Sequence, residues 1–250
     1  MALTARLLVS FPLLCVALAA QNYVSFEGAG ADRLFRQSRT ALGGEASVIS
    51  ITAFVMKGTV RVSTPDGGPP ERAIEIRALL PDQYLRIESG GPWTRRSGFS
   101  GASLLTEIRK GDTIDKPPAQ ITAALHRGEK ARFARLLLGL ASLATPEVWL
   151  TIKQPGDVTE VGSALGRVLE VTSKDNFMTQ VFYDTPGLPL RVEYEANKRR
   201  VSITFGDRRK VAGVLLPHTI TTTVDGLPVD EIRLSEIAVN PALTKADFGG

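Results

Sequence analysis

The chain has 250 residues, 43% of them hydrophobic and 22% charged, and its 23 Gly and 15 Pro are typical of a globular protein. This composition excludes a disordered chain, a collagen and a long coiled coil, and a formal net charge of +4 does not by itself point to nucleic acid. One Cys and two His are too few for a disulfide framework or a structural zinc site, so we expect no metal site.

The first twenty residues have the layout of a secretory signal peptide. Arg6 is followed by an apolar run from Leu7 to Ala20, which ends in the small residues of an A-x-A cleavage site. An uncleaved anchor is the alternative, although the run is shorter than the roughly 20 apolar residues that span a bilayer. We expect cleavage after Ala19 or Ala20, export to the periplasm or cell envelope, and one mature domain over residues 21–250.

The mature chain begins with a predicted helix over Ala29–Leu42, which Gly43 and Gly44 end. After it, apolar residues recur every second position, which is the pattern of half-buried strands. The segments with this alternation are, in chain order, 54–62, 74–78, 85–88, 148–152, 169–171, 188–195, 201–205, 214–224 and 232–234. Their connections are short, which favours an antiparallel meander of about 9–11 strands.

A second amphipathic helix is predicted over Ala119–Leu143, in the middle of the strand series. Its apolar face has the spacing i, i+3, i+4 and i+7, and consists of Phe133, Leu136, Leu137 and Leu140. Gly128 and Gly139 indicate either a hinge in this helix or its end.

The predicted fold class is therefore mainly β with two amphipathic helices. An antiparallel sheet of this size curls, and its concave apolar face must be closed or covered. The two helices are the only candidates for that cover. Beneath them the sheet holds either a filled core, which the strand pattern alone favours, or a cavity, whose presence the sequence does not measure.

Catalytic motifs are weak. Ser100 lies in Gly98-Phe99-Ser100-Gly101, which lacks the second Gly of a nucleophile elbow and is interpreted as a turn. His218 alternates with apolar residues and is interpreted as a core His bonded to backbone. Phosphate-binding, dinucleotide and calcium motifs are absent from the sequence, so we expect no cofactor and no enzyme, and a hydrolase is only the third hypothesis.

Basic residues cluster at Arg95-Arg96, at Lys198-Arg199-Arg200 and at Arg208-Arg209-Lys210. The favoured interpretation is solvated turn charge that keeps strand edges soluble. The alternative is attraction to anionic lipid headgroups. Only 6% of the residues are aromatic, so a stacking surface for nucleic acid is not expected.

Several short motifs occur in the order found in one known superfamily. They are Ala41-Leu42-Gly43-Gly44, Gly58, Pro81-Asp82-Gln83-Tyr84, Asp184-Thr185-Pro186-Gly187-Leu188-Pro189, Gly213-Val214-Leu215-Leu216-Pro217-His218, Val239-Asn240-Pro241 and Phe248. In this order the chain resembles the LolA/LolB-like superfamily, and more closely the envelope proteins called outer membrane lipoprotein-sorting proteins. The resemblance implies an unclosed antiparallel β half-barrel with a helical lid, whose hydrophobic cavity accepts the acyl chains of lipids or lipoproteins.

The first functional hypothesis is accordingly a non-enzymatic envelope carrier, whose partner is a lipid or an acylated protein. The side chains predicted to face inward are its candidate cavity lining: Phe54, Met56, Val60, Ile74, Ile76, Leu85, Ile87, Phe133, Leu136, Leu137, Leu140, Leu150, Leu190, Tyr194, Ile203 and Phe205. The second hypothesis, from another class, is a protein-interaction or stress-sensor module that uses the same curved sheet. A continuous apolar cavity favours the first hypothesis, and a filled interior with an exposed edge strand favours the second.

Overall fold

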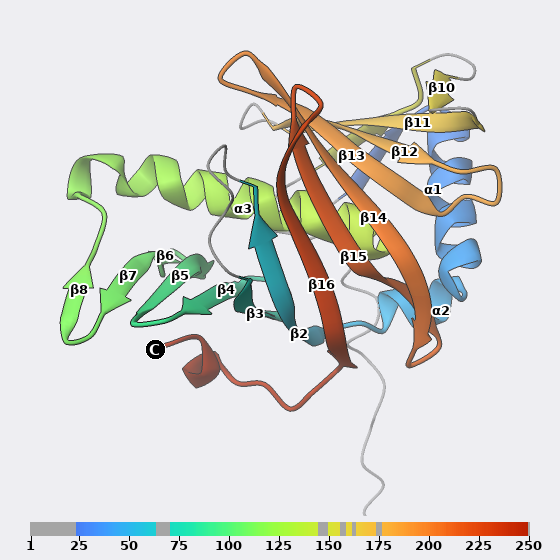
Figure 1. Cartoon of the computed structure of the whole chain (residues 1–250). Coiled ribbons are helices and arrows are strands. Elements are labelled where there is room, and N and C mark those ends of the chain that lie inside the picture. Colours follow the sequence, from blue (N-terminus) through green and yellow to red (C-terminus); the bar gives the residue numbers. More distant parts are fainter. Residues whose placement is uncertain are drawn as a thin grey trace, which may run out of the picture.

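The computed structural model describes residues 24–63, 71–144, 150–155, 159–161, 164–173 and 177–249, so the predicted signal peptide lies outside the described residues. These residues form one curved sheet of sixteen strands with three α-helices (Figure 1). The predicted fold class, a mainly β half-barrel that stays unclosed and carries a helical lid, is confirmed. The strand count exceeds the expected 9–11, because several short or exposed strands lack the alternation by which strands were counted.

The helices are α1 (Ala29–Leu42), α2 (Glu45–Ile49) and α3 (Ala119–Ala141), and a 3-10 helix covers Lys245–Phe248. The strands are β1 (Val24–Glu27), β2 (Ala53–Val62), β3 (Arg72–Leu79), β4 (Gln83–Gly90), β5 (Trp93–Ser100), β6 (Ser103–Leu104), β7 (Glu107–Lys110), β8 (Thr113–Asp115), β9 (Leu150–Lys153), β10 (Thr159–Val161), β11 (Ala164–Thr172), β12 (Met178–Tyr183), β13 (Pro189–Ala196), β14 (Arg199–Val211), β15 (Val214–Val224) and β16 (Leu227–Val239).

Two meanders make up the sheet, and they join at its centre. The strand order is β1-β9-β11-β12-β13-β14-β15-β16-β2-β3-β4-β5-β7-β8, with β10 beside β11 and β6 beside β5. The last strand of the second meander, β16, pairs antiparallel with the first strand of the other, β2. Consequently β8 and β9, which are consecutive strands in the chain, lie near opposite edges of the sheet. The segment that connects them has to cross the whole sheet.

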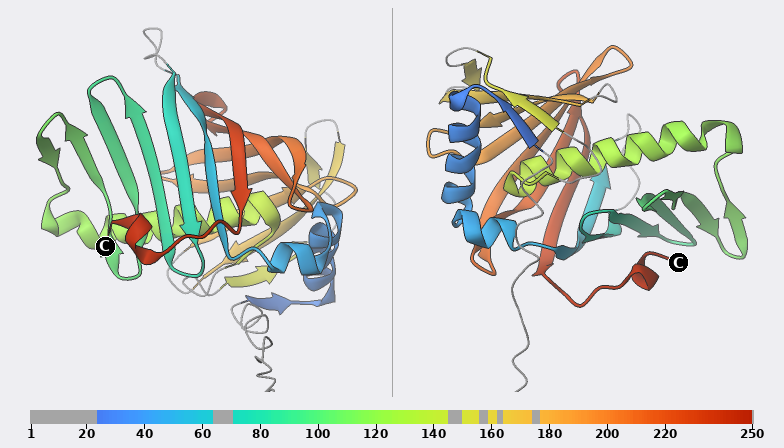
Figure 2. Two further views of the ribbon diagram at one scale, coloured as in Figure 1. Left: turned by 90° about the horizontal axis from the view of Figure 1, so that it is seen from below. Right: turned by 180° about the vertical axis from the view of Figure 1, so that it is seen from behind.

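Helix α3 is that crossing segment. Its 23 residues correspond to about 35 Å of helix. Figure 2 shows α3 along the inner side of the curved sheet, with α1 crossing its carboxyl end. The carboxyl half of α3, from Phe133 to Ala141, is almost entirely buried, whereas residues 119–128 are mostly exposed. The helix is thus a lid that is embedded at one end and projects at the other.

Close packing holds the embedded end of α3. A Cβ atom added at Gly139 would lie 2.1 Å from two ring carbons of Phe205, so only glycine allows the helix to approach β14 this closely. Gly139 lies within the continuous helix and marks neither a hinge nor an end. The helix instead ends at Ala141, where Ser142 takes a left-handed conformation with φ 50°.

A guanidinium group fixes the same end of α3 to three strands. Both terminal nitrogens of Arg208 donate to backbone carbonyls: Nη1 to Leu140 and Leu215 at 3.0 Å each, and Nη2 to Gly139 at 2.9 Å and Pro189 at 2.5 Å. Two of these carbonyls belong to the last turn of α3, where the helix dipole favours a cation. The expectation that the run 208–210 is solvated turn charge is therefore wrong for Arg208.

The inward position of Arg208 depends on an irregularity in β14. Phe205 and Arg208 both contact Gly139, although strict strand alternation would place residues three apart on opposite faces. Asp207, between them, has a φ of 49°, which breaks the extended backbone. This single left-handed residue turns a surface cation into an interior one.

The convex face of the sheet carries its own cover. Residues 240–248 run back beneath β3–β5 (Figure 2), and Phe248 is fully buried there. Arg77 Nη1 donates to the Asp247 carbonyl at 2.9 Å. Asn240 begins this segment: its Oδ1 accepts from the Thr52 backbone N–H at 2.8 Å, and its Nδ2 donates to the Ser50 carbonyl at 2.9 Å. The sheet is therefore covered on both faces along β4.

Helix α1 is anchored to the end of α3 by polar contacts. Ser38 and Ser142 share a hydrogen bond of 2.6 Å between their hydroxyl oxygens, and Arg39 Nε donates to the Ser142 carbonyl at 3.0 Å. The predicted helix over Ala29–Leu42 is confirmed with its bounds. Gly43 follows it in close contact with β15, because a Cβ atom there would lie 2.2 Å from the Gly213 carbonyl oxygen.

Replacing Gly139 with Ala should destabilise the protein, because the added methyl group would overlap the Phe205 ring. We expect a loss of about 1–3 kcal/mol in the free energy of unfolding, measured by denaturant titration. Gly128→Ala on the exposed half of α3 is the matched control: its Cβ meets nothing within 4 Å, so it should gain up to about 1 kcal/mol. Equal effects of the two substitutions would contradict the close packing of α3 on β14.

Replacing Arg208 with Met should cost about 2–5 kcal/mol, because four buried carbonyl oxygens lose a charged donor. The adjacent Arg209→Met is the control. Arg209 is 61% exposed, and among the described residues its one ion pair is with Asp207 at 2.6 Å, so its removal should leave stability nearly unchanged. Thermal and chemical unfolding of both variants measure the difference, and similar losses would show that Arg208 is no special anchor.

Candidate functional site

A cavity of about 490 Å³ lies between α3 and the concave face of the sheet. Its volume falls in the range of small-molecule sites. One part of its wall is apolar and comes from β2, β3, α3 and the strands β14–β16: Val62, Ile76, Leu136, Ile203, Phe205, Ile220, Val229 and Ile232. The other part is polar: Arg72, Tyr84, Arg86, Glu88, Arg95, Ser97, Arg132, Tyr194, Thr222 and Asp230. The cavity is therefore amphipathic.

The charged wall is organised around Glu88 on β4. One carboxylate oxygen of Glu88 accepts from Arg86 Nε at 2.9 Å, and the other lies 3.4 Å from Arg72 Nη1. Arg86 also approaches Asp230 of β16, with 3.9 Å between Nη2 and Oδ2. The second oxygen of Asp230, Oδ1, is buried and has no hydrogen-bond partner among the described residues. One buried acceptor oxygen on the cavity wall is therefore without a partner among the described residues.

Helix α3 adds a cation and an aromatic contact to the polar wall. Arg132 pairs with Glu129, one turn earlier, at 3.1 Å. Tyr84 is buried beneath it, and burial raises the pKa of that phenol above its usual value, so Tyr84 stays a neutral donor. The ring of Tyr84 stacks on Phe133 with 4.8 Å between centroids, which ties α3 to β4.

Arg135, one turn further along α3, is held between aromatic rings. Its guanidinium carbon lies 3.7 Å from the Tyr194 centroid and 4.7 Å from that of Phe177. Burial lowers the pKa of Arg135 to about 10, which still leaves it protonated at neutral pH. Tyr194 therefore lines the cavity in a fixed orientation.

The structure divides the sixteen predicted lining residues into three groups. Five of them line the cavity: Ile76, Leu136, Tyr194, Ile203 and Phe205. Eight are buried in the core beside it, where side chains fill the space between α3 and the sheet: Phe54, Met56, Val60, Ile74, Phe133, Leu137, Leu140 and Leu150. Filled core and cavity thus coexist under one lid, the core around the carboxyl end of α3 and the cavity beside Arg132 and Leu136.

The remaining three do not line the cavity. Leu190 is half-buried on β13. Leu85 and Ile87 alternate along β4 with the cavity-lining Tyr84, Arg86 and Glu88, so they lie on the opposite face of the sheet. Leu85 is nevertheless fully buried, because the chain end with Phe248 covers that face. Their assignment as inward-facing residues is wrong for this physical reason: β4 is covered on both sides.

The polar wall of the cavity was not predicted from the sequence. Arg86 and Glu88 alternate with Leu85 and Ile87 and were therefore expected on the outer face, and Arg95 was interpreted as solvated turn charge. Arg72 and Asp230 were not among the candidate site residues. The available signal was Tyr84-x-Arg86-x-Glu88, three polar residues spaced by two, which share one face of a strand. That pattern fixes the shared face but not which face is concave.

The weak catalytic candidates lie apart from this chemistry. His218 is buried and its Nδ1 lies 3.2 Å from the Leu216 carbonyl oxygen, as expected of a core His. Ser100 ends β5, so the predicted turn at 98–101 begins only after it. The described part of the chain contains no group of three or more His, Cys, Asp or Glu side chains in position to hold a metal. Nor does any described helix combine the length and apolar character that a membrane crossing requires.

Comparison with known proteins identifies the fold. No protein-family model and no curated protein matches the chain. Among solved structures it is similar to a LolA superfamily protein from Nitrosomonas europaea, at 11% identity and a TM-score of 0.58 over 88% of this chain and 97% of that one. It is also similar to a candidate outer membrane lipoprotein-sorting protein domain from Vibrio parahaemolyticus, at 12% identity and a TM-score of 0.56 over 88% and 96% of the two chains.

A third similar structure is a DUF1329 family protein from Desulfovibrio piger, at 9% identity and a TM-score of 0.54 over 87% of this chain and 96% of that one. All three similarities extend over nearly the full length of both chains, at identities that carry information on fold alone. The chain thus adopts the LolA-like fold, an unclosed half-barrel with a helical lid.

Proposed function

We propose that this protein binds a lipid, or a lipid-modified protein, by placing an acyl chain in the cavity beneath α3, and that it acts without catalysis as a carrier. In this proposal the signal peptide directs it to the periplasm or cell envelope. The named relatives of this fold include a candidate lipoprotein-sorting domain, which agrees with the proposal at the level of fold.

The observation that carries the proposal is the apolar part of the cavity wall. Eight hydrophobic side chains line it, and several of them, including Ile76, Phe205 and Ile220, also belong to the main hydrophobic core. An acyl chain exposed to water costs about 0.8 kcal/mol per methylene group, so a lipid crosses an aqueous compartment only inside such a lining. A volume of about 490 Å³ suits about one acyl chain rather than several.

The amino-terminal half of the lid provides the entry route in this proposal. Its carboxyl half is fixed by Gly139 and Arg208, whereas residues 119–128 have few buried side chains. Within that exposed stretch, His126 contacts the turn after β5, where its Nε2 lies 3.0 Å from the Gly101 carbonyl oxygen. Opening at the projecting end therefore breaks few contacts.

The first test is native mass spectrometry of the mature protein purified from a bacterial envelope, followed by extraction and identification of bound lipids. We expect a stoichiometric lipid or acyl adduct. Protein that stays bare after incubation with envelope lipids would overturn the proposal and favour the protein-interaction module instead.

Replacing Leu136 with Trp should fill the cavity from the lid side. Leu136 is 9% exposed and lines the cavity, so the indole has room to enter it without displacing the core. We expect at least tenfold weaker binding of a fluorescent fatty acid, with the melting temperature changed by only a few degrees.

Ile121→Trp is the matched control for this substitution. Ile121 lies on the same helix but is 45% exposed and outside the cavity, so the control should leave both binding and stability unchanged. If Leu136→Trp bound the fatty acid as well as the control variant does, the acyl site would lie elsewhere.

A further inference from the structure

The charged wall of the cavity points to the chemistry of the ligand's polar end. Resting on the proposed lipid-binding function, we infer that the ligand is an anionic amphiphile, whose phosphate or carboxylate group is bound by Arg95 at the mouth of the cavity. The acyl chain then lies against the apolar wall formed by Leu136 and its neighbours.

The argument begins with the number of charges on the wall. Four arginines but only two carboxylates, Glu88 and Asp230, line the cavity. Glu129, just outside the lining, neutralises Arg132 at 3.1 Å. The remaining excess is one positive charge. A cation without a protein partner that borders an apolar cavity is available to an anionic group of a ligand.

The unpaired cation is Arg95. In the register of β4 and β5 it lies directly opposite Glu88, the position from which a cross-strand ion pair would be expected. Both oxygens of Glu88 are already engaged, one by Arg86 and the other by Arg72. None of the described residues forms an ion pair with Arg95. The guanidinium of Arg95 is therefore left without an ion pair, because Glu88 is already bound by two other arginines.

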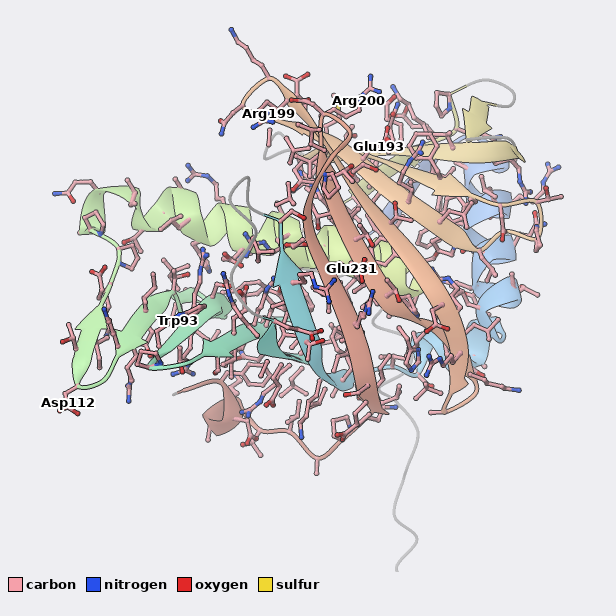
Figure 3. The ribbon with its side chains drawn as sticks, viewed as in Figure 1. Trp93, Asp112, Glu193, Arg199, Arg200 and Glu231 are labelled. Atoms are coloured by element: carbon pink, nitrogen blue, oxygen red, sulfur yellow. The ribbon has the colours of Figure 1, made fainter. Side chains whose placement is uncertain are left out.

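The position of Arg95 suits the entry of a headgroup. It is exposed to solvent while lining the cavity, so it marks the mouth. Beside it, the guanidinium of Arg72 is held over the ring of Trp93 with 4.8 Å between its carbon and the centroid, which fixes a second cation in place. Figure 3 labels Trp93 at the start of β5, on the part of the sheet that α3 overhangs.

A planar guanidinium with five donors matches phosphate and carboxylate oxygens, so the shared chemistry of the ligand is an oxyanion attached to an apolar chain. Phospholipids and free fatty acids are two sources of that chemistry. The test separates them with three amphiphiles of the same chain: 1-palmitoylglycerol, 1-palmitoylglycerol 3-phosphate and palmitate. The first two differ only in the phosphate.

Binding of each amphiphile below its micellar concentration is measured on the full mature protein by displacement of a fluorescent fatty acid. We expect the phosphate-bearing lipid to bind at least tenfold more tightly than neutral 1-palmitoylglycerol. If palmitate also binds at least tenfold more tightly than 1-palmitoylglycerol, the site accepts oxyanions in general. If palmitate binds no more tightly than 1-palmitoylglycerol, the site is specific for the phosphate of phospholipids. Higher salt should weaken the preference, because Arg95 is exposed.

Arg95→Gln should reduce the tenfold preference to threefold or less while leaving the affinity for 1-palmitoylglycerol unchanged. Arg95→Lys, which keeps the charge, should keep most of the preference. The control is Arg61→Gln: Arg61 is exposed on β2 and lies on the opposite face from its cavity-lining neighbour Val62. Melting temperatures of all three variants should stay within a few degrees of the unmodified protein.

Two outcomes overturn the inference and remain distinguishable from failure of the proposed function. If the neutral and phosphate-bearing lipids bind equally, or if the preference survives Arg95→Gln, the protein binds acyl chains but Arg95 does not select an anion. If none of the three amphiphiles binds, the lipid-binding function itself fails, and the inference fails with it.

Discussion

The arrangement of this protein depends on one topological constraint: consecutive strands β8 and β9 lie near opposite edges of the sheet, because β16 pairs with β2 at the centre. The chain between them has to cross the concave face, and a helix is the structure that can do so with its backbone hydrogen bonds satisfied internally. The lid helix α3 is therefore the covalent connection between the two meanders of the half-barrel. The positions at which α3 is fixed to the sheet determine which part of the interior is filled core and which part is cavity.

The link is held unevenly, and this unevenness creates the cavity. At the carboxyl end Gly139 lets α3 press on Phe205, and Arg208 binds two of its last carbonyls, so the space is filled by side chains such as Leu137 and Leu140. Farther toward the amino end, beyond Leu136, the wall carries arginines and carboxylates whose charged groups require water or a ligand beside them. The contacts between α3 and the sheet decrease from the carboxyl end of the helix to its amino end. This decrease explains why one helix covers both a filled core and an amphipathic cavity.

Sequence periodicity predicted both long helices and most of the long strands, because 3.6- and two-residue patterns survive wherever one face is buried. It missed β7 and β8, whose side chains are mostly exposed and therefore carry no alternation. It also missed β5 and β12, in which consecutive residues are buried, so that apolar and polar residues do not alternate. It also placed Leu85 and Ile87 inside, since alternation gives two faces without naming the concave one. Arg208 was out of reach for another reason: its burial depends on the left-handed Asp207, a local conformation without a signature in a run of charged residues.

The double contact at Ser142 has a consequence beyond the cavity. Ser38 and Arg39 of α1 both bind this residue, which lies one position past the end of α3, so the amino-terminal helix and the lid share a single joint. A rotation of α3 about its fixed end would be transmitted to α1 and to β1 beside it, at the far edge of the sheet. Strand β1, the first strand that the structure describes, is thereby mechanically coupled to the position of the lid.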